Sequence, residues 1–462
     1  MSAGLHGYVG DIPYLRDFKP MLAPAWLDHV ALCCGVEPPA RRNGFTWCDL
    51  GCGQGVTAAI LAATHPRGRF YGIDAMAVHI DHARRLASEA GIGNLHLDAV
   101  DFATAGRCRL PQFDYLVAHG VYSWIDAASQ AVLRRLIDRH LKPGGLVYIS
   151  YNAMPGWMPD LPFQRLVHEL GRVGAGDSAA RLAAATEVIG RMAAAGVPAL
   201  ARSATLAGLA AQPQDYPAAY LVHEFMHAAW RPLYVTEMRR AMAEIGLVPV
   251  GSATLSENFD ALVLRDAART LLAGIADRDV RELLRDFFLD QRLRCDVFDR
   301  GNRRLAGAER ETRLLETSYA LCRPAAAIHY RMTTAAGARG YDSPVARAIV
   351  AALASGPRRL AGLVPAPDLL EALLTLCAAG EVMPVEPGHA PVERLNRAIG
   401  QRLDSAEEIL WLALPCGTAV AVDRELLRAL RRGTKPDGRR FPGWRDFLAA
   451  HGVPAQEGLP AQ

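Results

Sequence analysis

The sequence predicts an α/β fold with a doubly wound parallel sheet, followed by a smaller and mostly helical region. Within the first 151 residues, short apolar runs alternate with amphipathic stretches of helical spacing. Strands separated by helices require right-handed crossovers, which place parallel strands in one sheet. Beyond about residue 270, helical patterns dominate. The 462 residues also exceed one ordinary core, which indicates two or three domains.

The predicted elements of this sheet have recognisable ends. The first helix ends at His65-Pro66, Gly91 closes the second, and Pro143 followed by two glycines stops the third; such residues do not continue a helix. The strands are predicted at 44–50, 68–74, 94–100, within 113–124 and at 146–152, and the helices at 55–66, 77–91 and 126–145. In such folds, ligands bind at the carboxyl ends of the strands.

The remaining segments predict an insertion, a closing strand pair and C-terminal modules. An Ala-rich helical stretch at about 160–215 suits an insertion that covers a pocket. Strand patterns at 247–255 and 260–266 predict an antiparallel pair that finishes the sheet. After residue 342, a helix, a short helix, a third helix and a Gly-led strand resemble a winged helix. The predicted domains are 1–268, 269–388 and 389–462.

Composition and charge exclude several classes of protein. A net charge of +3 gives no argument for nucleic acid or for an anionic membrane surface. No apolar run reaches the ~18 residues of a membrane span, and the N-terminus lacks the pattern of a signal peptide. The nine cysteines are odd in number and irregularly spaced, which predicts reduced thiols in a cytoplasmic protein and no metal site.

The stretch "CDLGCGQG", residues 48–55, joins the first predicted strand to the first helix. Glycines let this backbone turn sharply and approach a ligand, although such a loop is also found as a purely structural turn. A dinucleotide site would show Gly-x-Gly-x-x-Gly, whereas here Asp49 precedes Gly-x-Gly-x-Gly. An acid at that place repels a pyrophosphate but holds an ammonium. The predicted ligand is therefore S-adenosylmethionine (SAM).

Two further acids follow the next two strands. Asp74 ends the second strand about 20 residues after the glycines, where an acid takes ribose hydroxyls. Asp101 follows the third strand, where its carboxylate is expected to accept from the adenine amino group with Phe102 beside the ring. The predicted cofactor-binding residues are Tyr14, Asp49, Gly51, Cys52, Gly53, Gln54, Gly55, Asp74, Ala75, Asp101, Phe102 and His119.

The consecutive motifs "DLGCGQG", "GID" and "VDF" resemble those of class I SAM-dependent methyltransferases. The stretches "AHGVYSW", "SYNAMPGW", "YLVHEF" and "LRCDVFDRG" resemble a bacterial subgroup. In this subgroup a methyltransferase regulatory domain follows the Rossmann-like methyltransferase domain, and its members include the rickettsial protein-lysine methyltransferases that modify outer-membrane protein. The resemblance implies methyl transfer from SAM with S-adenosylhomocysteine (AdoHcy) as product. It also implies a lysine acceptor in a protein or peptide.

Other functions stay open on the sequence alone. One is methylation of a small molecule in a biosynthetic pathway, and another is a non-catalytic binding or assembly role that retains the fold. Enzymes that methylate the amines of nucleic-acid bases often carry the motif Asn/Asp-Pro-Pro-aromatic after the fourth strand. This chain has Ala118-His-Gly-Val-Tyr122 there, which disfavours methylation of bases. A homodimer is also left open.

Methyl transfer from a sulfonium is an in-line displacement, so the site must align and desolvate the acceptor. The predicted catalytic residues are His119, Tyr122, Tyr151, His223 and Glu224, and the predicted acceptor-binding residues are Tyr8, Tyr122, Trp124, Asn152 and Trp157. Each has a structural alternative: His119 as part of the pocket wall, Tyr122 and Trp124 as core residues, Asn152 as a turn cap, and His223 with Glu224 as a structural pair.

Overall fold

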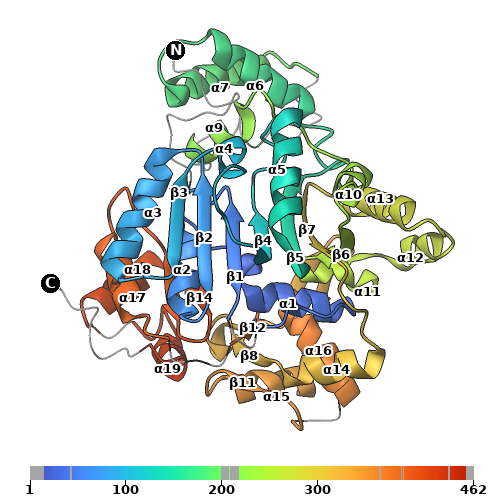
Figure 1. The fold of residues 1–462 in the computed structure, drawn as a ribbon, viewed down its shortest axis with the longest axis vertical. Helices are drawn as coiled ribbons and strands as arrows, with labels where there is room; N and C mark the ends of the chain where they lie inside the picture. The colour runs from blue at the N-terminus through green and yellow to red at the C-terminus, as the bar shows by residue number, and fades with distance from the viewer. Residues whose placement is uncertain are drawn as a thin grey trace.

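A seven-stranded sheet forms the centre of the computed structural model (Figure 1). Its strand order is β3-β2-β1-β4-β5-β7-β6, and the first five of these strands are parallel, which confirms the predicted doubly wound α/β fold. The strands are β1 Thr46–Leu50, β2 Arg69–Asp74, β3 Leu95–Ala99, β4 Phe113–Ala118, β5 Leu141–Asn152, β6 Val248–Ser252 and β7 Leu293–Asp299. The structure describes residues 15–41, 44–198, 208, 218–363, 366–386, 388, 390–434 and 437–453.

Alternate residues of the central strands face opposite layers of helices. Trp47 and Tyr115 pack with helices α1 (Pro24–Cys33) and α2 (Val56–Thr64). Their neighbours Cys48 and Leu116 instead pack on the other face. That face is covered by α5 (Ala127–His140) and α10 (Val235–Ala243), while α3 (Ala77–Ala90) lies beside β2 and β3. Every residue of β1 and β4 is buried, as expected of central parallel strands.

The prediction for the edge of the sheet was wrong in one respect. Strand β6 forms within the predicted segment 247–255, but its partner is β7, which pairs antiparallel with both β6 and β5. Segment 260–266 is instead helical, as α11 (Asp260–Val263) and the start of α12 (Asp266–Ala273). The sheet thus takes a strand from beyond residue 268, while the domain boundary proposed there stays a prediction.

A helical cap lies over the carboxyl edge of the sheet. In Figure 1, β1 and β2 point toward α9 (Ala218–Phe225), and α6 (Leu161–Val173) and α7 (Ser178–Ala194) lie beyond it. These helices share a separate apolar cluster that includes Trp157, Phe163 and Ile189. Helices α6 and α7 fall within the Ala-rich segment 160–215, whose residues 199–207 and 209–215 lie outside the described part of the chain. The cap therefore has its own core.

The C-terminal region contains several short helices and three small sheets. The helices are α13 Arg278–Leu289, α14 Gly307–Glu316, α15 Pro344–Leu353, α16 Ala366–Ala378, α17 Glu393–Gln401, α18 Arg424–Arg431 and α19 Trp444–Ala450. The strands are β8 Ser318–Leu321, β9 Arg331–Thr334, β10 Gly337–Gly340, β11 Arg358–Arg359, β12 Val382–Val385, β13 Trp411–Leu414 and β14 Thr418–Ala421. The short helix predicted around Arg358 is strand β11, because its backbone pairs with β8.

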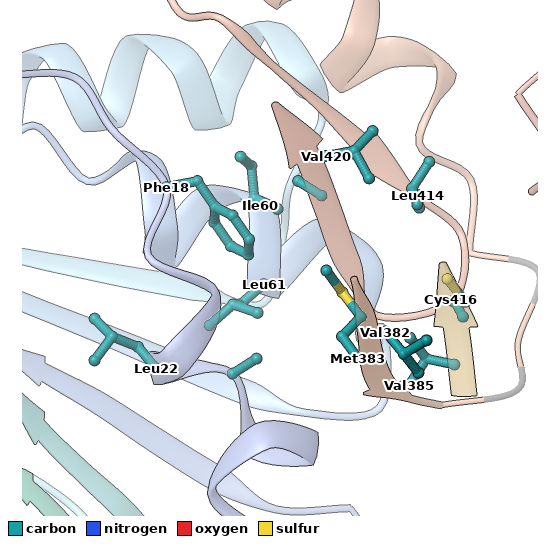
Figure 2. Close-up of a cluster of buried hydrophobic side chains, with 14 of the residues drawn as sticks. Phe18, Leu22, Ile60, Leu61, Val382, Met383, Val385, Leu414, Cys416 and Val420 are labelled. Atoms are coloured by element: carbon teal, nitrogen blue, oxygen red, sulfur yellow. The ribbon is translucent and has the colours of Figure 1, made fainter. Parts of the chain in front are cut away.

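This region packs directly against the first domain. Helix α17 lies along α3, and the β13–β14 hairpin lies on α2 (Figure 1). Figure 2 shows the contact: Phe18, Leu22, Ile60 and Leu61 of the first domain share one buried cluster with Val382, Met383, Val385, Leu414, Cys416 and Val420. Within the described residues, no helix has the length and apolar character needed to cross a membrane.

Candidate active site

A cavity of about 320 Å³ opens at the carboxyl edge of the sheet, between the strand ends and α9. Elements far apart in the sequence meet there, including the loop after β1, the ends of β2, β3 and β4, and α9. Most of the predicted site residues line it: Asp49, Gly51, Cys52, Gly53, Gln54, Gly55, Asp74, Ala75, Asp101, Phe102, His119, Trp124, His223 and Glu224.

The glycine loop after β1 depends on the small size of its residues. Gly51, Gly53 and Gly55 all have positive φ, at 98°, 52° and 70°, a region in which L side chains are strained. A Cβ at Gly51 would lie 2.4 Å from a methyl group of Val121, and one at Gly55 would lie 2.4 Å from Cβ of Ala83. At Gly53 a Cβ would meet no atom within 4 Å. The loop thus packs tightly against neighbouring side chains at Gly51 and Gly55. At Gly53, which lines the cavity, the space next to the backbone is open.

Asp49 is a buried carboxylate at the wall of the cavity. Only 4% of the residue is exposed, and its Oδ1 has no hydrogen-bond partner among the described residues. Burial, together with the nearby Asp74, raises the pKa of Asp49 to about 8. A buried acceptor without a donor is costly, so an ammonium group of a ligand would satisfy it.

Asp74 is held in one orientation by the backbone. Its Oδ2 accepts a hydrogen bond of 2.8 Å from the amide of Gly53, and its Oδ1 accepts one of 2.8 Å from the amide of Met76. Nδ1 of His79 lies 3.2 Å from the same Oδ1. Each carboxylate oxygen can accept further bonds, so the side chain is preorganised for hydroxyl groups in the cavity.

Asp101 lies at the end of β3 and caps the short helix α4 (Phe102–Ala105). Its Oδ1 accepts a hydrogen bond of 2.7 Å from the amide of Thr104. Both Asp101 and Phe102 line the cavity. Asp49, Asp74 and Asp101 thus lie at or just beyond the carboxyl ends of β1, β2 and β3.

His119, directly after β4, is half-buried. Burial and the nearby Lys19 lower the pKa of His119 to about 4. Its Nδ1 lies 2.8 Å from the hydroxyl of Tyr148. A histidine with so low a pKa is a poor general base near pH 7, which favours a role in shaping the wall.

Glu224 is the carboxylate on the opposite side of the cavity, on α9. Burial raises the pKa of Glu224 to about 7. Its Oε1 accepts a hydrogen bond of 2.9 Å from Nδ2 of Asn152, at the end of β5. His223 and His227 line the cavity beside it. A carboxylate with a pKa near 7 is suited to exchange a proton at neutral pH.

Four predicted residues do not reach the cavity. Tyr122 lies in the core, where Arg134 donates to its hydroxyl at 2.9 Å. Asn152 is buried and acts on the site only through Glu224. Trp157 packs in the core of the cap and donates to the carbonyl of Arg292 at 2.8 Å. Tyr151 is the fourth, and Tyr8 and Tyr14 lie outside the described residues.

The hydroxyl of Tyr151 points into a buried ion network rather than the cavity. It donates to Asp296 on β7 at 2.7 Å, and Asp296 pairs with Arg294, which also pairs with Asp286. The expected direct catalytic role is therefore corrected, since this partner lies on the side of β5 away from Asn152.

Changing Tyr151 to phenylalanine tests this placement. The loss of one buried hydrogen bond is expected to lower the free energy of unfolding by about 1 kcal/mol, and ligand affinity at the cavity should stay unchanged. Denaturant unfolding and titration calorimetry measure the two quantities. If the variant has wild-type stability but has lost activity, the hydroxyl of Tyr151 acts in the active site and the structural role is wrong.

The sequence also left residues unassigned that the structure brings to the cavity. Leu15, Asp17 and Lys19, which precede α1, line the cavity. His227, which follows α9, lines it as well. The only signal for Lys19 was its rarity, because Lys142 and Lys435 are the only other lysines.

Comparisons with known proteins identify the family of the chain. Residues 41–183 match a family described as "Methyltransferase domain", and residues 217–300 match "Predicted methyltransferase regulatory domain". The second match overlaps the predicted middle domain, 269–388, only over residues 269–300. The chain is 31% identical over 451 residues to the protein sll1526 of Synechocystis sp., and the alignment covers 94% of this chain and 89% of that protein.

Relatives in Rickettsia are also similar. The chain is 33% identical over 147 residues to the protein RP028 of Rickettsia prowazekii, covering 32% of this chain and 58% of that one. The structure of PKMT2 from Rickettsia typhi in complex with AdoHcy has the same fold, with a TM-score of 0.69 and 18% identity over 95% of this chain and 91% of that one. The chain belongs to the SAM-dependent methyltransferases in which a methyltransferase regulatory domain accompanies the catalytic domain.

Proposed function

We propose that the cavity binds SAM along the carboxyl edge of the sheet and that the enzyme methylates lysine side chains of a protein. The observation that carries the first part is the series of acids at three successive strand ends. In this arrangement Asp101 and Phe102 bind the adenine, Asp74 binds the ribose hydroxyls, and Asp49 binds the ammonium. The unpaired oxygen of Asp49 fits this assignment because the ammonium supplies the missing donor.

The chemistry of Glu224 supports an amine as the methyl acceptor. A free lysine amine has a pKa of about 10.4 and must lose a proton before it can attack. Glu224 is an acceptor with a pKa of about 7 at the wall of the cavity, and Asn152 fixes its orientation. The sequence resemblance to the rickettsial protein-lysine methyltransferases points to the same acceptor.

The roles of the chain's residues follow from this placement. When bound, SAM supplies an electrophilic methyl group on a sulfonium. Glu224 attracts the lysine ammonium and takes its proton, leaving the lone pair on nitrogen for in-line attack. Trp124 lines the same space, where its ring can contact a cationic group. The cap covers this edge of the sheet, and the displacement of water by bound ligands would strengthen these charge interactions.

A labelling experiment tests the acceptor. Purified enzyme, bacterial extract and SAM carrying a labelled methyl group are incubated, and the products are analysed by mass spectrometry. The proposal expects label on lysine-containing peptides. Label only on a metabolite would indicate the small-molecule methyltransferase instead, and cofactor binding without any transfer would indicate the binding or assembly role.

Changing Asp49 to asparagine is expected to raise the free energy of unfolding and to weaken ligand binding. The pKa of Asp49 in the folded protein, about 8, is far above the ordinary value of about 3.9 for an aspartate, so the wild-type protein loses stability as pH rises between these values. The variant should therefore be more stable at pH 8 by several kcal/mol, because each unit of pKa difference contributes about 1.4 kcal/mol, and it should bind AdoHcy at least about 10-fold more weakly. Thermal melts at pH 5 and 8, with and without AdoHcy, measure both effects. A variant that binds AdoHcy as wild type does would contradict the assignment.

A further inference from the structure

Residues 15–22, which we call the N-terminal strap, border one end of the cavity. Leu15, Asp17, Lys19 and Leu22 line it. The amide of Lys19 donates to Oγ1 of Thr57, in the first turn of α2, at 3.1 Å. Lys19 is also close enough to His119 to lower its pKa. The strap therefore lies beside β1 and β4, at the end of the cavity away from Asp101 on β3.

The electrostatics of the cavity single out Lys19. The lining carries the carboxylates of Asp17, Asp49, Asp74, Asp101 and Glu224. Among the described lining residues, Lys19 is the only lysine or arginine. A ligand that brings its own carboxylate into this acidic space needs a positive partner, because an unpaired buried anion is costly.

We propose that Lys19 binds the carboxylate of the methionine portion of the cofactor. This inference rests on the proposed binding of SAM, whose adenine at Asp101 and ammonium at Asp49 leave the amino-acid end beside β4. The side chain of Lys19 is 35% exposed, so it can reorient. Its ammonium has three donors, and one of them is engaged by Oδ2 of Asp17 at 2.6 Å.

The C-terminal region holds this lysine in position. Nε1 of Trp411, on β13, donates to Oδ1 of Asp17 at 2.7 Å. Phe18 packs edge-on against the ring of Trp411, with 5.3 Å between centroids. Arg16 donates to the carbonyl of Ala406 at 2.7 Å. Figure 2 shows Phe18 beside the C-terminal strands in the shared core. Trp411 is thus a positioning residue, and the C-terminal region influences cofactor affinity through Asp17.

Two ligands of different length test the role of Lys19. AdoHcy has the amino-acid carboxylate, and 5′-methylthioadenosine lacks the whole amino acid. By titration calorimetry, Lys19→Met should weaken AdoHcy binding at least about 10-fold and change 5′-methylthioadenosine binding by less than about 2-fold. Lys142→Met is the matched control, since Lys142, at the start of β5, pairs with Asp114 of β4 and does not line the cavity. This variant should bind both ligands as wild type does.

Trp411→Phe tests the positioning role, because it keeps an aromatic ring against Phe18 but removes the donor to Asp17. We expect AdoHcy affinity to fall about 3- to 10-fold with 5′-methylthioadenosine unaffected. Trp444→Phe, on α19, is the control for general damage to the C-terminal region.

The outcomes separate the two proposals. If wild-type protein binds neither ligand, the proposed function fails. If wild type binds both and Lys19→Met weakens both equally or neither, the role of Lys19 is overturned. If Lys19→Met behaves as expected but Trp411→Phe matches wild type, control by the C-terminal region is overturned.

Discussion

Replacing Asp74 with alanine is expected to weaken SAM binding by at least about 100-fold, because two charge-assisted hydrogen bonds to the ribose, each worth about 1.5–3 kcal/mol, would be lost. The same carboxylate anchors the glycine loop through the amide of Gly53. Its removal should therefore also loosen the backbone nearest the ligand. Titration calorimetry with SAM and AdoHcy measures the loss.

A matched variant, Asp81→Ala, controls for the removal of a carboxylate. Asp81 lies on α3, and its side chain is 61% exposed. It should bind both ligands as wild type does. If Asp74→Ala folds and binds SAM with wild-type affinity, the site assignment at β2 is wrong.

Changing Glu224 to glutamine is expected to lower the turnover number by about 100-fold or more, the usual contribution of a general base. Cofactor affinity should change little, because the proposal assigns Glu224 to the acceptor and not to the cofactor. The amide can still pair with Asn152, so the cap should keep its fold. Initial rates at saturating SAM and calorimetry with AdoHcy measure the two effects.

The pH profile adds a second measurement for Glu224. Its pKa of about 7 means that the side chain takes up a proton as pH falls below 7 and can no longer accept one from the acceptor. The wild-type rate should therefore fall below pH 7, and this break should be absent in the glutamine variant. Glu187→Gln, an exposed change on α7, should retain the wild-type profile. Equal profiles for wild type and Glu224→Gln would contradict the base assignment.

The cofactor side of the site was predictable because it depends on local sequence. The loop at 51–55 follows β1, Asp74 ends β2 and Asp101 comes two residues after β3, and the ends of parallel strands meet at one edge. The structure brings all of these residues to one cavity. Strand β7 was missed because its partners β5 and β6 are distant in sequence and its pattern lies among helices.

The acceptor side was harder to predict. Neighbours in a strand point to opposite faces, so Tyr151 enters the ion network around Asp296 although Asn152 faces Glu224. Tyr122 follows β4 closely, yet its ring turns into the core. The contact between Asp17 and Trp411 joins residues 394 positions apart. Neither composition nor periodicity carries that kind of information.

A crystal structure of the protein with AdoHcy tests the central claim most directly. The account predicts the compound in the cavity at the carboxyl edge, with ribose hydroxyls about 2.7–3.0 Å from the carboxylate of Asp74, the ammonium at Asp49 and the adenine beside Phe102. AdoHcy bound elsewhere, or bound in the reverse direction with its adenine at β4, would contradict it.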